Sequence, residues 1–94
     1  MQVTLLGTNG WFDTATGNTP CVLVESNDWT VIFDAGYGFA KIDQYGVGSK
    51  PVYLIMSHFH YDHLIGLHTL AKNEFKAGLT ILGMTGIREA MHDF

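Results

Sequence analysis

The sequence predicts an α/β (α+β) fold in which a mixed β-sheet carries its helices on one face. Short segments rich in β-branched or aromatic residues are bounded by glycine, proline or polar clusters, which is typical of strands. Apolar stripes at helical spacing follow the later segments. The order is strands first and then strand–helix–strand–helix, and this order indicates helices packed on one side of the sheet.

Five segments are expected to be strands: residues 3–6, 21–25, 30–33, 52–56 and 79–82. Asn27 and Asp28 stand between the second and third, a spacing that predicts a hairpin turn. Residues 52–56 are apolar at every position, which predicts a strand covered on both faces.

Two longer stretches and one shorter stretch are expected to be helices. Residues 62–72 begin at Asp62 and carry an apolar stripe of Leu64, Ile65, Leu67, Leu70 and Ala71. Residues 85–93 open with a capping-type threonine. The shorter helix is expected at residues 39–45.

Composition limits the classes of partner. Five Lys and Arg against nine Asp and Glu give a net charge of −4, which argues against a broad basic face for wrapping nucleic acid. Cys21 is the only cysteine, so no intrachain disulfide forms, and its place in a strand predicts a core residue. No basic leader opens the chain, and no apolar run approaches the roughly 20 residues of a membrane helix, so we expect a cytoplasmic protein without a membrane partner.

The chemistry of the sequence is concentrated in Ser57-His58-Phe59-His60-Tyr61-Asp62-His63, directly after an apolar strand. Extended chain places His58 and His60 on the same side, where both imidazoles can bind one metal ion. The expected turn into a helix at Asp62 directs Asp62 and His63 toward the position of a second metal ion beside the first. Nitrogen and carboxylate ligands suit zinc, with manganese or iron as alternatives, so we predict half of a two-metal site.

This His-x-His-x-Asp-His pattern resembles the metal-binding signature of the metallo-β-lactamase superfamily. Flanking segments resemble ribonuclease Z and its phosphodiesterase relatives, although ribonuclease Z usually has glycine at the position of Tyr61. The segments that carry the second resemblance are Leu5-Leu6-Gly7-Thr8, Asn18-Thr19-Pro20-Cys21, Phe33-Asp34-Ala35-Gly36 and Gly86-Ile87-Arg88-Glu89.

The resemblance implies a binuclear metal-dependent hydrolase of phosphodiesters with a metal-activated hydroxide as nucleophile. It implies Zn²⁺, two ions per complete site, with Mn²⁺ or Fe²⁺ as alternatives. His58 and His60 would bind the first ion and Asp62 and His63 the second, which also makes Asp62 the expected catalytic residue. The substrate would be a small phosphodiester or RNA. The alternative within the superfamily is a thioester, lactone or β-lactam hydrolase.

Two further features each allow two interpretations, and a third, His68, has one preferred interpretation. The resemblance makes Asp34 a residue that orients the metal ligands, while the local pattern also fits a turn-forming aspartate at a strand end. Trp11 and Phe12 either form the floor of a substrate pocket or pack against their surroundings. His68 lies on the helix after the motif and is expected to be solvated.

In the superfamily, a third histidine, a bridging aspartate and a last histidine complete the metal site from positions well downstream. After His63 only His68 and His92 remain, and neither lies in a matching motif. Residues 1–94 therefore resemble the N-terminal half of the αββα sandwich, a partial domain that we expect to be inactive alone. We expect a homodimer or association with the missing C-terminal half; a non-catalytic, self-associating half-domain is the second alternative.

Overall fold

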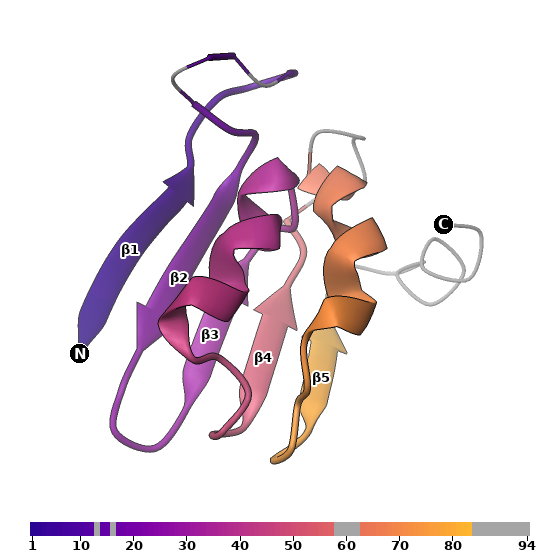
Figure 1. The fold of residues 1–94 in the computed structure, drawn as a ribbon. Helices are drawn as coiled ribbons and strands as arrows, with labels where there is room; N and C mark the ends of the chain where they lie inside the picture. Colours follow the sequence, from indigo (N-terminus) through magenta and orange to yellow (C-terminus); the bar gives the residue numbers. More distant parts are fainter. Residues whose placement is uncertain (13, 16, 58–62, 84–94) are drawn as a thin grey trace.

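The structure, a computed structural model, describes residues 1–12, 14–15, 17–57 and 63–83. They form a five-stranded sheet in the order β1-β2-β3-β4-β5 (Figure 1). The strands are β1 Gln2–Gly7, β2 Cys21–Glu25, β3 Thr30–Phe33, β4 Val52–Ile55 and β5 Leu79–Leu82. The pairs β1/β2 and β2/β3 are antiparallel, and the pairs β3/β4 and β4/β5 are parallel. The mixed sheet confirms the predicted fold class.

The turn between β2 and β3 is built around Ser26. Its hydroxyl oxygen accepts hydrogen bonds from the backbone N–H groups of Asp28 and Trp29, at 3.2 and 3.1 Å. The Ser26 N–H donates to the Trp29 carbonyl at 3.0 Å. These bonds close the turn and set the register in which Glu25 pairs with Thr30. The predicted hairpin at Asn27 and Asp28 is confirmed.

Two 3₁₀ helices, η1 (Tyr37–Tyr45) and η3 (Ile65–Lys72), lie on the same face of the sheet (Figure 1). Each connects two adjacent parallel strands, and both connections step across the sheet in the same direction. Because such connections are almost always right-handed, both helices fall on one face. Asp62 and the predicted helix 85–93 lie outside the described residues. Within the described residues, no helix has the length and apolar composition needed to cross a membrane.

The core fills the space between this face and the two helices. Leu23, Ile32 and Leu54 of the central strands and Phe39 and Ile42 of η1 are fully buried. Cys21 belongs to the same cluster, which confirms it as a core residue. Burial raises the pKa of the Cys21 thiol from 9.0 to about 12, and the negative charge of Asp34 adds to this rise. The Lys41 ammonium has a smaller effect in the opposite direction.

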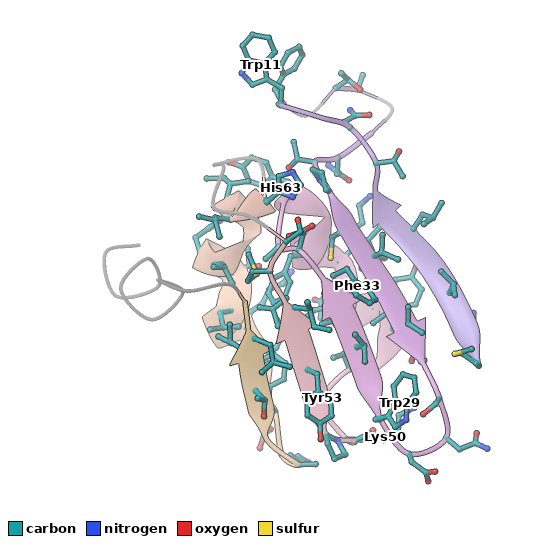
Figure 2. All side chains as sticks on the ribbon, turned by 180° about the vertical axis from the view of Figure 1, so that it is seen from behind. Trp11, Trp29, Phe33, Lys50, Tyr53 and His63 are labelled. Carbon is teal, nitrogen blue, oxygen red and sulfur yellow. The ribbon has the colours of Figure 1, made fainter. Side chains whose placement is uncertain are left out.

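The opposite face of the sheet is apolar as well. The strand register aligns two rows across it: Val3, Val24, Val31, Tyr53 and Thr80 form one, and Leu5, Val22, Phe33, Ile55 and Leu82 form the other. We call these two rows the open face. Leu5 is 66% exposed and Phe33 42%, and Figure 2 shows Phe33 and Tyr53 on this side.

The expectation that residues 52–56 are covered on both faces is wrong for the described chain. Val52, Leu54 and Met56 are buried beneath the helices, whereas Tyr53 is 38% exposed on the open face. The reason is topological: both helices lie on one side, and no described segment covers the other. A strand that is apolar at every position indicates that both of its faces are covered, but it does not identify the segment that covers the second face.

A close contact at Gly66 fixes where η3 lies. The Gly66 N–H donates to the Ala35 carbonyl at 2.8 Å. A Cβ at this position would overlap the Gly36 carbonyl oxygen and would lie 2.7 Å from the Phe39 Cβ. We therefore expect Gly66→Ala to lower the free energy of unfolding by about 3 kcal/mol, because backbone must move to admit the methyl group. Urea unfolding measures the loss.

Gly10→Ala is the matched control, because a Cβ at Gly10 would meet no atom within 4 Å. We expect it to change the free energy of unfolding by less than about 0.5 kcal/mol. Equal losses for the two variants would contradict a close approach between η3 and the residues that follow β3.

Candidate metal centre

The strand directions bring four chain segments to one edge of the sheet. β1 and β3 are both antiparallel to β2, so β1 runs in the same direction as β3, β4 and β5. Their carboxyl ends therefore meet at a single edge. At such an edge, open α/β sheets commonly bind ligands. The residues after β1, β3 and β4 begin here, and Figure 2 shows His63 at the same edge.

Asp34 is the central residue of this edge. It follows β3, is 8% exposed and has a left-handed backbone with φ of 64°. Its Oδ1 accepts a hydrogen bond from the Ser57 N–H at 2.8 Å. The Ser57 hydroxyl donates to the same carboxylate, with distances of 3.0 Å to Oδ1 and 2.7 Å to Oδ2. The carboxylate therefore fixes the start of the segment 57–63, directly beyond β4.

The far end of the same segment is fixed by Asp34 and its neighbour Ala35. The Ala35 N–H donates to the His63 carbonyl at 2.8 Å. The His63 Nδ1 lies 3.1 Å from the Asp34 Oδ2, and both side chains are largely buried. Asp34 and Ala35 thus contact both described ends of the segment. We call this arrangement the Asp34–Ala35 anchor.

The anchor fits the chemistry of a metal-binding histidine. The Asp34 carboxylate lies within ion-pair distance of Nδ1. In histidine ligands whose Nδ1 proton is held by such a carboxylate, the Nε2 lone pair is the metal-binding donor. Histidine ligands in proteins commonly have such a carboxylate or carbonyl behind them. The pair His63 and Asp34 is therefore suited to hold a zinc-type ion through Nε2.

The predicted site residues fall into two groups. His58, His60 and Asp62 lie outside the described residues, so their assignment as ligands stays a prediction. His63 and Asp34 are described and lie in contact. His68 is exposed, as expected, with its Nδ1 2.5 Å from the Ile65 carbonyl oxygen and its ring 5.7 Å from that of Tyr37.

Ser57 is a functional candidate that the sequence reasoning did not single out. Its hydroxyl and N–H are the donors that connect Asp34 to the histidine-rich segment. A serine immediately before the first histidine was visible in the sequence. Its partner was not, because the pairing depends on β3 and β4 being neighbours.

The family model described as the metallo-beta-lactamase superfamily matches residues 14–81. The chain belongs to this superfamily. Ribonuclease Z of Haloarcula marismortui is 32% identical over 93 residues, which are 94% of this chain and 30% of that protein. Ribonuclease Z of Clostridium acetobutylicum is 30% identical over 97 residues, 97% of this chain and 31% of that protein. The chain thus spans about 30% of the length of these curated relatives.

Solved structures show the same fold. The metallo-beta-lactamase fold protein YhfI from Bacillus subtilis superposes with a TM-score of 0.78 and 26% identity, over 97% of this chain and 41% of that chain. Human tRNase Z, short form, superposes with a TM-score of 0.72 and 24% identity, over 99% of this chain and 39% of that chain. The resemblance inferred from the motifs is confirmed, and the described residues share the metallo-beta-lactamase fold with about 40% of each of these two chains.

The Asp34–Ala35 anchor predicts a large effect of Asp34→Ala on stability. The variant leaves the Ser57 N–H without its acceptor and places alanine in a left-handed conformation. We expect a loss of about 3 kcal/mol in the free energy of unfolding, measured with urea. Asp34→Asn keeps one oxygen and a side chain that tolerates this backbone, so its loss should be about 1 kcal/mol.

Asp43→Ala is the control, because among the described residues the Asp43 side chain pairs with the exposed Lys72, with 3.3 Å between the Lys72 Nζ and the Asp43 Oδ2. Exposed pairs contribute less than about 1 kcal/mol, so little should change. The anchor would be refuted if Asp34→Ala were no more harmful than Asp43→Ala.

Proposed function

We propose that this chain carries the first half of the metal site of a phosphodiesterase similar to ribonuclease Z. The observation that carries the proposal is the Asp34–Ala35 anchor, which contacts both described ends of the segment bearing the His-x-His-x-Asp-His pattern. Support for the substrate class comes from the relatives named ribonuclease Z, which match 94% and 97% of the chain. A hydrolase of phosphodiesters, RNA among them, fits both.

In this proposal His58 and His60 hold one zinc ion and Asp62 and His63 hold the second, with Mn²⁺ or Fe²⁺ as alternatives. Asp62 is the catalytic residue among them. When bound, the two ions supply a nucleophile that is ionised near neutral pH and stabilise charge on the phosphoryl oxygens. The role of the described residues is to hold the ligands in place. Asp34 orients His63, and Ser57 connects Asp34 to the end of β4.

The four residues of the motif make an incomplete site. Tightly bound zinc normally has three or four protein ligands, whereas His58 and His60 alone would supply two. The remaining ligands would come from the part of a longer protein that corresponds to the relatives' other residues. The 94-residue chain would then bind at most one metal ion weakly and would show no turnover. We keep the cytoplasmic location as part of the proposal.

Activity measurements on the longest protein that contains this chain test the proposal. After zinc loading, it should hydrolyse bis(p-nitrophenyl) phosphate faster than a thioester. His58→Ala and His60→Ala should each lower that rate at least about a thousandfold, because the electrostatic arrangement at the reacting phosphate is lost. His68→Ala is the matched histidine control and should stay within about twofold of the wild type.

Metal analysis after dialysis supplies the second readout. The 94-residue chain should retain at most one ion and should not hydrolyse the phosphodiester. Two retained ions per 94-residue chain together with turnover would contradict the half-site. Preferential thioester hydrolysis by the longer protein would contradict the phosphodiesterase assignment.

We further propose that a second β-sheet covers the open face. A longer protein would supply that sheet from its own remaining residues, and the 94-residue chain would take it from a second copy of itself. The two apolar rows, in which Thr80 is the polar exception, match the inner face of a sandwich. A charged fraction of 15% supports this assignment, since soluble domains usually carry about 25%.

The second copy predicts a symmetric dimer of the 94-residue chain. Sedimentation velocity at high micromolar concentration should give a dimer, and Phe33→Glu should give a monomer because it places a charge at the centre of the apolar contact. Tyr45→Glu is the control, since Tyr45 is 40% exposed at the end of η1, on the helix side. A compact wild-type monomer would overturn the dimer and leave the longer protein's own sheet as the covering element.

A further inference from the structure

Two aromatic side chains stand in solvent on the segment between β1 and β2. Trp11 is 83% exposed and Phe12 61% exposed. Their ring centroids lie 5.9 Å apart and their planes are inclined by 58°. Solvating two large apolar rings is costly, and an exposed aromatic cluster is typical of a binding surface. The pair is therefore a candidate for contact with a ligand.

Hydrogen bonds connect the described residues of this segment to one another. The Asn9 N–H donates to the Asn18 carbonyl at 2.9 Å, and the Thr14 N–H donates to the Gly17 carbonyl at 2.9 Å. The Asn9 side-chain amide donates to the Thr14 hydroxyl at 3.1 Å. Trp11 itself has a left-handed backbone with φ of 77°, which costs energy for a bulky residue. Such strain is found most often where function requires a particular side-chain direction.

The same segment is connected to the candidate metal centre. The Thr19 hydroxyl accepts a hydrogen bond from the Tyr37 N–H at 2.7 Å, and the Pro20 carbonyl accepts one from the Gly36 N–H at 2.8 Å. Gly36 follows the Asp34–Ala35 anchor directly. Figure 2 shows Trp11 and His63 at the same end of the molecule, with Trp11 projecting beyond the sheet edge.

The composition of the segment indicates which chemical group it recognises. Residues 8–19 contain no lysine or arginine, so they offer no cationic side chain to a phosphate. Aromatic rings instead stack on the π-face of a nucleobase, a contact that tolerates any base. The inclined rings of Trp11 and Phe12 offer two aromatic faces, and these lie close enough together to stack on one base or on two successive bases. An extended protein interface would need a larger apolar patch than this pair provides.

We propose that Trp11 and Phe12 bind the nucleobase next to the phosphodiester that the metal centre cleaves. The proposal rests on the proposed function and adds to it the residues that hold a nucleoside beside the scissile phosphodiester. The rings hold the base by stacking, and the sheet edge positions the attached phosphate toward the histidine-rich segment. The pair acts on substrate binding and takes no part in proton transfer.

A binding experiment on the 94-residue chain tests the proposal without any turnover. In a Trp29→Phe background, Trp11 is the remaining tryptophan, so its fluorescence reports on this segment alone. Adenosine 5′-monophosphate should quench it saturably, and ribose 5-phosphate, which lacks the base, should not. Phe12→Ala should weaken binding of the nucleotide about tenfold. Tyr45→Ala, which removes an exposed ring from the far end of η1, should leave it unchanged.

Kinetics on the zinc-loaded longer protein provide the second arm. Trp11→Ala with Phe12→Ala should raise the KM for thymidine 5′-(p-nitrophenyl phosphate) about tenfold and leave its kcat within about twofold. Methyl p-nitrophenyl phosphate has the same leaving group and no base, so its kinetics should not change. Trp11→Tyr, which keeps a ring, should restore most of the nucleoside preference.

The outcomes separate this proposal from the proposed function. Equal quenching by adenosine 5′-monophosphate and ribose 5-phosphate, or quenching by phosphatidylcholine vesicles alone, would overturn base recognition. Equal losses on the two p-nitrophenyl substrates would do the same. Absence of hydrolysis by the wild type would refute the proposed function, whereas the fluorescence titration would still decide whether the rings bind a base.

Discussion

The contact on which this end of the molecule depends is the pairing of the Asp34 carboxylate with the start of the segment 57–63. One acidic side chain accepts from both the N–H and the hydroxyl of Ser57 and also lies against His63. The position demands two properties together. Its backbone is left-handed, which glycine, asparagine and aspartate adopt at low cost, and its side chain must be a short carboxylate. Aspartate is the residue that satisfies both requirements.

The sheet topology makes that contact available. Asp34 and Ser57 are far apart in the sequence, but each follows the last residues of one of two neighbouring parallel strands. The helices approach the same edge of the sheet closely through glycines. A Cβ at Gly38 would lie 2.8 Å from the Leu6 carbonyl oxygen, and one at Gly66 would overlap the carbonyl oxygen of Gly36. Backbone packing at this edge is therefore tight enough to fix the direction in which the anchor presents its partners.

The two faces of the sheet explain the unusual composition of the chain. The helix side buries a continuous cluster that includes Leu23, Ile32 and Leu54. The open face repeats apolar residues across all five strands, although no described segment packs on it. A sheet that is apolar on both sides leaves few positions for charged residues, which accounts for the low charged fraction.

The sequence by itself determined the local features. Short segments rich in β-branched or aromatic residues, bounded by glycine, proline or polar clusters, predicted the strands to within one residue of their observed ends. Strand propensity and turn chemistry are properties of neighbouring residues, so the sequence alone carries them. The histidine-rich motif likewise indicated the family, which the match over residues 14–81 confirms. The shorter helix was predicted too, although η1 begins at Tyr37 rather than at residue 39.

Only the tertiary structure showed that the two interpretations of Asp34 hold together. Asp34 is a turn residue with a left-handed backbone, and its side chain also contacts Ser57 and His63. The sequence also failed on the burial of Tyr53, because an apolar strand pattern records which side chains avoid water and not which segment covers them. Strand order and the placement of both helices on one face set these long-range contacts. Both features depend on the handedness of the crossover connections and on packing between residues far apart in the sequence, which no local pattern records.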